Sequence, residues 1–270
     1  MHVLRLEIVL AVIFVFILAC LLATRWIAPG SSIYWSQFAA YQRGDYQAQL
    51  KIIEGIGVRG ESPEYLLFHG IACLELGRLQ EAEQVIRRSM SMKTNLEANI
   101  VCLDKLGHVL MEQGRWDEAA ACFRDCILKS PNRGGGHRAI AEGLLRRGVR
   151  NEAALDAARL GVAADRARSY RSKLGKEERA ISLSESLAFL AWALAKNRAG
   201  PAEVESTLKE AFALCGENRK PVLAELHFCA GHAYADLGNT NDSIRHFKCA
   251  TGIDPIGNYG RLSRPVRATG

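Results

Sequence analysis

The sequence predicts an all-α protein in which an N-terminal transmembrane helix precedes an α-solenoid of about six helix–turn–helix repeats. Three observations predict this class. The first is an uncharged apolar run at residues 8–24. The second is the recurrence of apolar residues at spacings of three and four through most of the remaining chain, the period of one helical face. The third is a series of glycines separated by 33, 37 and 34 residues: Gly44, Gly77, Gly114 and Gly148.

The apolar run predicts a single-pass signal anchor. It holds twelve Leu, Ile, Val or Phe residues and no charge, so its transfer into the bilayer is favoured by roughly 4–7 kcal/mol. Its 17 residues would span about 26 Å as a helix, and extension to Ala28 reaches the ~30 Å hydrocarbon thickness. Trp26 stands where an interfacial aromatic residue is expected. We therefore assign residues 8–28 to the membrane and residues 1–30 to the anchor.

Two alternatives to the anchor remain open. A cleavable signal peptide would need a polar, small-residue cleavage region, which the stretch "LLATRWIAP" offers only poorly. A lipoprotein signal is suggested by "ILAC", which ends at Cys20, although Leu21 and Leu22 follow where a polar tether is expected. The basic residues on the two sides of the run nearly balance, so they do not fix its orientation.

The clearest repeat is found at residues 96–131. Its first half places Ile100, Leu103, Leu106 and Leu110 on one helical face. Gly114 breaks this pattern, and a second periodic run begins at Trp116 and continues through Ala119, Phe123 and Ile127. Pro131 ends the second helix. The small residues Gly107 and Ala119 fall where the two helices would cross, which would let their backbones approach closely.

Similar spacings recur elsewhere in the chain, at Gly70, Gly77 and Ala82 and again at Gly231, Gly238, Phe247 and Pro255. With Leu103, Gly107, Ala119 and Phe123, they make the chain resemble the tetratricopeptide-repeat family over residues 31–255. The resemblance implies a scaffold of stacked helix pairs. We place repeats at 31–60, 62–92, 96–131, 134–165, 181–216 and 221–255, with a basic connector at 166–180 and a flexible basic tail at 256–270.

No residue pattern predicts an enzyme, a cofactor or a metal site. The histidines form no HExxH pair, and no Gly-rich phosphate loop or GxSxG elbow is present. Seven of the eight cysteines lie in the repeat region. An odd number on apolar helical faces indicates free buried thiols, including Cys122 and Cys126 one helical turn apart. Free thiols favour a cytoplasmic location for the repeats.

The resemblance implies that a protein or peptide partner binds the concave face lined by the first helix of each pair. The chaperone-binding type of repeat uses Lys and Asn to hold a terminal carboxylate. Leu67, Ile71, Asp104 and His108 occupy the matching places here, so no such clamp is expected. The residues expected to face a partner are Glu64, Leu67, Ile71, Glu75, Asp104, His108, Met111, Glu112, Arg138, Glu142, Arg146, Phe228, His232 and Asp236.

Residues 166–179 carry six basic side chains and only two acidic ones. This stretch is interpreted either as a solvated connector or as a contact for anionic lipid or an acidic partner. The net charge of +6 is accompanied by no nucleic-acid signature. Two functional hypotheses follow: a membrane-anchored scaffold that recruits or assembles protein partners, and an exported assembly factor for secretion or envelope biogenesis.

Overall fold

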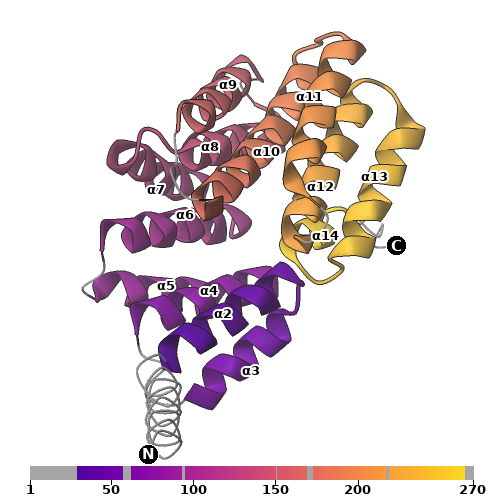
Figure 1. Ribbon diagram of the computed structural model, residues 1–270. Coiled ribbons are helices and arrows are strands. Elements are labelled where there is room, and N and C mark those ends of the chain that lie inside the picture. The colour runs from indigo at the N-terminus through magenta and orange to yellow at the C-terminus, as the bar shows by residue number, and fades with distance from the viewer. Residues whose placement is uncertain are drawn as a thin grey trace, which may run out of the picture. The chain divides into compact units, whose positions relative to one another are not determined.

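The computed structural model describes residues 29–56, 62–92, 95–149, 151–168, 173–216 and 219–264. Regular structure in these ranges is entirely helical, which confirms the predicted all-α class. The chain divides into two compact units, residues 1–39 and 40–270. The thirteen helices of the described ranges (Figure 1) are α2 (Pro29–Gln42), α3 (Tyr46–Ile56), α4 (Pro63–Glu75), α5 (Leu79–Ser91), α6 (Leu96–Glu112), α7 (Trp116–Lys129), α8 (Gly134–Arg147), α9 (Asn151–Ala167), α10 (Lys173–Lys196), α11 (Pro201–Cys215), α12 (Lys220–Asp236), α13 (Thr240–Ile253) and α14 (Asn258–Leu262).

The predicted membrane span, residues 8–28, lies outside the described residues. Within the described ranges, no helix combines the length and the apolar character needed to cross a membrane.

Successive helices of the second unit pack as pairs: α4 with α5, α6 with α7, α8 with α9, α10 with α11, and α12 with α13. Gly77, Gly114, Gly148 and Gly238 end the first helix of their pairs with positive φ angles between 63° and 79°. Side chains with a Cβ rarely adopt this backbone conformation, so glycine is favoured where the chain reverses. The predicted inter-helix glycines are therefore the turns of the fold.

A second set of glycines brings the paired helices into contact. A Cβ atom added to Gly107 would lie 2.4 Å from the Phe123 ring, and one on Gly231 would lie 2.6 Å from Phe247. Gly70 meets Ile86 in the same way, at 2.4 Å. In each case the contacted side chain comes sixteen residues after the glycine. Gly107 and Ala119 were predicted to fall where the two helices cross, and Phe123 is the side chain that fills the space above the glycine.

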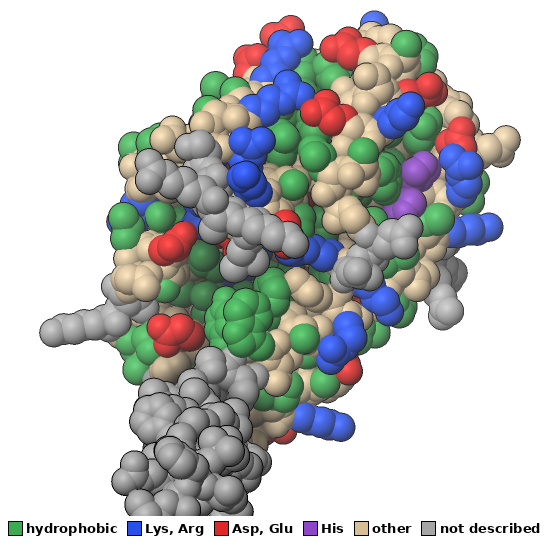
Figure 2. Space-filling view, in the orientation of Figure 1, with side chains coloured by type: hydrophobic (Ala, Val, Ile, Leu, Met, Phe, Trp, Pro, Cys, Tyr) green, Lys and Arg blue, Asp and Glu red, His purple; other side chains and the backbone are tan. Residues whose placement is uncertain are grey.

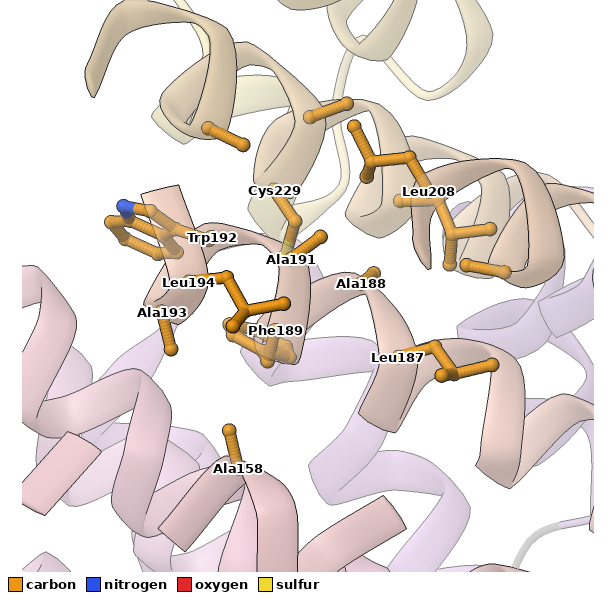
Figure 3. Packing of buried hydrophobic residues seen from close by; sticks show 14 of the residues in the cluster. Ala158, Leu187, Ala188, Phe189, Ala191, Trp192, Ala193, Leu194, Leu208 and Cys229 are labelled. Atoms are coloured by element: carbon orange, nitrogen blue, oxygen red, sulfur yellow. The ribbon is translucent and has the colours of Figure 1, made fainter. Parts of the chain in front are cut away.

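The apolar side chains form successive cores between neighbouring helices. In the largest, α10 carries the completely buried Phe189 and the nearly buried Trp192. Ala158 of α9 and Cys229 of α12 belong to the same cluster, which Figure 3 shows around α10. All seven cysteines of the described ranges are free, as predicted, and five of them are buried.

Two segments predicted to be irregular contain helix. The predicted basic connector at 166–180 is shortened at both ends, because α9 continues to Ala167 and α10 begins at Lys173. The predicted flexible tail at 256–270 contains the short helix α14, in which Asn258 and Gly260 are buried. The segment that contains α14 contacts the candidate site described below.

Candidate functional site

The candidate site is built on three carboxylates that lie near the ends of the first helices of three successive pairs. Glu75 belongs to α4, Glu112 to α6 and Glu142 to α8. Glu142 is almost completely buried, and Glu75 and Glu112 are half-buried. We call the surface formed by these three carboxylates the inner face.

The inner face is occupied by the chain's own C-terminal region, residues 254–263, which we call the closing segment. It follows α13 and returns through α14, which packs against α12 and α13 (Figure 1). The Asn258 backbone N–H donates to Glu75 Oε2 at 2.9 Å. The Asn258 side-chain amide donates to Glu112 Oε1 at 3.2 Å, and the Tyr259 hydroxyl donates to Glu142 Oε2 at 3.1 Å. Two consecutive residues thus provide a donor to each carboxylate of the inner face.

Further contacts join the closing segment to the first repeats of this unit. The Tyr46 hydroxyl of α3 donates to Asp254 Oδ2, across a sequence separation of 208 residues. Arg261 Nη2 donates to the Leu74 carbonyl at 3.3 Å. The Tyr259 ring packs against Phe228 of α12, with 5.3 Å between the ring centroids. The closing segment therefore bridges the first and last helix pairs of residues 40–270.

Two glycines allow the closing segment to fold back so tightly. A Cβ on Gly257 would lie 2.1 Å from Asp254 Oδ2, and a Cβ on Gly260 would lie 1.8 Å from the Asp254 carbonyl oxygen. Asp254 Oδ1 accepts the Gly257 N–H at 3.0 Å, which fixes the turn into α14. The glycines that predicted a flexible tail are thus required by close contacts, at Gly260 with the Asp254 backbone and at Gly257 with the Asp254 carboxylate.

Charged side chains surround the inner face and pair with one another. Arg146 Nη1 lies 2.5 Å from Glu112 Oε1 and 3.3 Å from Glu142 Oε1. Deeper inside, Arg138 Nη1 lies 2.6 Å from Glu185 Oε2, and its Nε lies 3.9 Å from Glu225 Oε1. A cavity of about 50 Å³ lies among Lys105, His108, Arg138, Glu225, Tyr259 and neighbouring residues.

The carboxyl groups on and near the inner face differ in the direction of their pKa shifts, because some are dominated by burial and one by a neighbouring positive charge. Burial raises the pKa of Glu75. Burial, reinforced by the charge of Glu185, raises the pKa of Glu225. Burial would also raise the pKa of Glu112, but the hydrogen bond and charge of Arg146 outweigh it and lower that pKa. The inner face therefore combines the ionised Glu112 with Glu75, which holds a proton more readily.

The residues expected to face a partner fall into three groups. Glu75, Glu112 and Glu142 bond to the closing segment, and Phe228 packs against it. A second group is largely buried but makes contacts with residues other than the closing segment. Asp104 Oδ2 lies 3.2 Å from Lys105 Nζ, and His108 Nδ1 lies 3.8 Å from Glu142 Oε2. Arg138 and Arg146 belong to this second group through the ion pairs described above.

The third group has no contact with the closing segment among the interactions described. Ile71 and Met111 are buried, and Leu67 packs against the apolar core. The rings of His232 and Trp192 stack at 4.3 Å, and Asp236 accepts the Trp192 indole N–H at 3.2 Å. Glu64 lies exposed in the first turn of α4. Whether any of these residues contacts a partner stays a prediction.

Sequence analysis missed the groups that occupy the inner face, namely Asp254, Asn258, Tyr259 and Arg261. They lie in a stretch with no helical period, and their contacts are 117 to 208 residues away in the chain. The only local signal is the clustering of turn-forming and hydrogen-bonding residues around Gly257 and Gly260.

A model of the tetratricopeptide repeat matches residues 100–129, which cover most of α6 and α7. No curated protein matches the chain in sequence. Among solved structures, PilF of Pseudomonas aeruginosa is similar at 12% identity and a TM-score of 0.46, over 86% of this chain and 95% of that one. The C-terminal part of a TPR repeat-containing protein from Cytophaga hutchinsonii is similar at 13% identity and a TM-score of 0.41, over 86% and 100%.

YrrB, described as a TPR protein with an unusual peptide-binding site, is similar at 15% identity and a TM-score of 0.38, over 78% of this chain and 95% of that one. These similarities are too low to carry residues of those proteins over to this chain. The match at residues 100–129, together with the same glycine contact in three helix pairs, supports a tetratricopeptide-repeat architecture for this chain.

Proposed function

We propose that the protein is a non-enzymatic scaffold that binds a segment of a partner protein on its inner face. The observation that carries the proposal is that this face already holds a peptide segment. Glu75, Glu112 and Glu142 each accept a hydrogen bond from residues far away in sequence. A face that can hold one segment through side chains and backbone has the chemistry to hold another.

The contacts define the kind of segment that fits. The closing segment offers a backbone N–H and a side-chain amide from Asn258 and a phenol hydroxyl from Tyr259. Arg261 adds a guanidinium beside Leu74. A buried acceptor left without a donor costs about 1–3 kcal/mol. A partner that displaces the closing segment must therefore supply an equivalent set of donors, as a short turn or helix with amide, hydroxyl and cationic groups.

Displacement also sets the affinity that a partner needs. The closing segment is tethered to α13 through a short connection, so its effective concentration at the inner face is about millimolar or higher. A partner must overcome this internal competition. Substitutions that weaken the closing segment should consequently increase the affinity for partners.

A binding experiment on the full-length chain in detergent tests the proposal. The probe is a labelled peptide with the sequence of residues 254–264. The receptor is a double variant, Asn258→Ala with Tyr259→Ala, whose own closing segment has lost its two side-chain donors to the inner face. We expect this variant to bind the peptide at least about tenfold more tightly than the unaltered chain.

Two matched controls show whether binding occurs at the inner face. A peptide carrying the same two alanines should not bind, and adding Glu112→Gln and Glu142→Gln to the receptor should weaken binding of the natural peptide. Equal binding of both peptides by the double variant would count against the proposal, as would no binding at all.

We further propose that residues 8–28 anchor the scaffold as a single-pass membrane protein with its repeats on the cytoplasmic side. The uncharged apolar run supports the anchor. The free thiols of the repeats support the reducing side. The competing hypothesis is an exported assembly factor for secretion or envelope biogenesis, held by the same run or lipid-anchored at Cys20. A reporter fused after Gly270 separates them, because activity on the exported side would contradict the cytoplasmic orientation.

A contact between residues 166–179 and anionic lipid is proposed as a secondary feature. Arg166 Nη2 is bonded to Glu210 Oε1 at 2.9 Å, and Arg179 Nη1 donates to the Arg168 carbonyl at 2.9 Å. Basic and acidic side chains lie side by side over much of the face shown in Figure 2. Reconstitution in vesicles with and without phosphatidylserine tests it. Equal protease protection of residues 166–179 in both kinds of vesicle would contradict a contact with anionic lipid.

A further inference from the structure

Three side chains of metal-ligand type converge where α4 and α5 meet, away from the inner face. They are His69 and Cys73 of α4 and Glu81 of α5. One nitrogen, the sulfur and one carboxylate oxygen all lie within 4.8 Å of one another. His69 Nε2 and Glu81 Oε1 lie 3.1 Å apart.

The fold fixes the positions of these residues independently of any ligand. His69 and Cys73 are four residues apart, so they share one face of α4. Gly70, which lies between them in sequence, packs against Ile86 of α5, since a Cβ there would lie 2.4 Å from that side chain. Glu81 stands in the first turn of α5, just after the turn at Gly77. The helix-pair packing that defines the repeat thus brings the three ligand atoms together.

We propose that His69, Cys73 and Glu81 form a binding site for a divalent transition metal of the zinc class. Imidazole nitrogen, thiolate sulfur and carboxylate oxygen are the three donor types that zinc takes in proteins. Three protein ligands leave the fourth tetrahedral position for water or for a ligand from another molecule. The site is distinct from the peptide-binding role proposed above and does not depend on it.

The geometry requires only a small adjustment. Zinc lies about 2.0–2.3 Å from such ligands, which in a tetrahedron separates the donor atoms by roughly 3.3–3.8 Å. The present spread of up to 4.8 Å therefore has to contract by about 1 Å. Cys73 is buried and fixed, whereas the side chain of Glu81 is 43% exposed and can move toward the other two ligands.

The charges also suit a divalent ion. With Cys73 bound as a thiolate and Glu81 as a carboxylate, the two ligands would balance the two positive charges of the ion. Arg78 Nη1 lies 3.8 Å from Glu81 Oε2 and opposes a cation, but this arginine is half exposed and can turn to solvent.

Cobalt(II) titration of the reduced full-length chain, stripped of metal by a chelator, tests the proposal. Tetrahedral cobalt bound to a thiolate gives a charge-transfer band in the near ultraviolet, which reports sulfur ligation directly. We expect one equivalent to produce this band and zinc to displace it. Cys73→Ser should abolish the band, Glu81→Gln should weaken binding at least about tenfold, and Arg78→Ala should strengthen it.

Cys122→Ser is the matched control, because Cys122 is a half-buried thiol on α7 outside the cluster; it should leave the band unchanged. Circular dichroism verifies that each variant is folded, and His69→Ala provides a second test should Cys73→Ser unfold the chain. The proposal is overturned if the folded chain shows no thiolate band at millimolar cobalt. It is equally overturned if the band survives both Cys73→Ser and His69→Ala.

Discussion

The interfaces within helix pairs and the inner face are held together by different kinds of contact. Within a pair, Gly107 contacts Phe123, and the surrounding side chains are apolar and closely packed. On the inner face, Glu112 and Glu142 are held by hydrogen bonds and ion pairs. Apolar packing depends on the shape of one particular neighbour. Hydrogen-bonded carboxylates depend on receiving suitable donors, so we expect the inner face to exchange its occupant while the helix pairs stay folded.

The largest expected effect comes from an apolar contact within a helix pair. Phe123→Ala removes the ring that covers Gly107 and should lower the free energy of unfolding by about 3–5 kcal/mol. Leu128→Ala is the matched control on the same helix, because Leu128 is 80% exposed, and it should change stability by less than about 0.5 kcal/mol. Urea unfolding followed by circular dichroism measures both. Similar losses for the two variants would show that the contact between Phe123 and Gly107 has no special role in stability.

An intermediate effect is expected where the closing segment meets α3. Asp254→Ala leaves the buried Tyr46 hydroxyl and the Gly257 N–H without their acceptor. It should cost about 1–3 kcal/mol and loosen the closing segment, while α6 and α7 remain folded. Ile256→Ala in the same turn, where the side chain is 41% exposed, should have little effect. Hydrogen exchange of the two variants locates the change, and loss of protection throughout α6 would show that the regions are not separable.

The pH dependence of stability should reveal the raised pKa of Glu225, which lines the cavity beside Tyr259. Burial and Glu185 raise the pKa of Glu225 above its unfolded value. The folded chain therefore binds this proton more tightly, and the resulting stability is present below the unfolded pKa of about 4.3 and is lost as pH rises toward the folded pKa. Relative to Glu225→Gln, the unaltered chain should lose at most about 1.4 kcal/mol per pH unit across that window.

Comparison with Glu225→Gln is necessary because buried histidines act in the opposite direction. Burial lowers the pKa of His232 to about 4, so its neutral form stabilises the fold above the unfolded pKa and this stability is lost as pH falls. The histidines are present in both proteins and cancel in the difference. A difference that stays constant from pH 4 to pH 7 would rule out a raised pKa for Glu225.

The smallest effect is expected from removing a single donor of the closing segment. Tyr259→Phe deletes the hydroxyl that bonds to Glu142 and keeps the ring against Phe228. It should cost about 0.5–1.5 kcal/mol and increase binding of the 254–264 peptide. Calorimetric unfolding and peptide titration give the two readouts. Unchanged peptide affinity together with lost stability would make Tyr259 a structural residue only.

The features that sequence predicts are those encoded over short distances. The glycine turns and the glycine contacts sixteen residues apart belong to one repeat, so their spacing is visible in the chain. Phe123, one turn along α7 from Ala119, is the side chain that fills the space at Gly107. Local periodicity thus predicts the helix pairs and most of their contacts.

The candidate site could be predicted only in part. Glu75, Glu112 and Glu142 follow from their place on first helices, but the groups that bond to them lie in an aperiodic, glycine-containing stretch. A stretch of such composition is typical of a flexible segment. The sequence alone does not show that buried carboxylates far away in the chain accept its hydrogen bonds. The cluster of His69, Cys73 and Glu81 was missed for a related reason, because its third ligand lies across a turn on the next helix.

Hydrogen exchange of the full-length chain tests most directly whether the closing segment is an exchangeable occupant. The informative amides are those of Asn258, which donates to Glu75, and of Arg261 and Ser263, which donate to the carbonyls of Gly257 and Tyr259. We expect them to exchange at least about tenfold faster than the α6 amides, since they open without global unfolding. Saturating 254–264 peptide should accelerate them further and leave α6 unchanged. Exchange of both groups at one common rate, unaffected by peptide, would contradict the account.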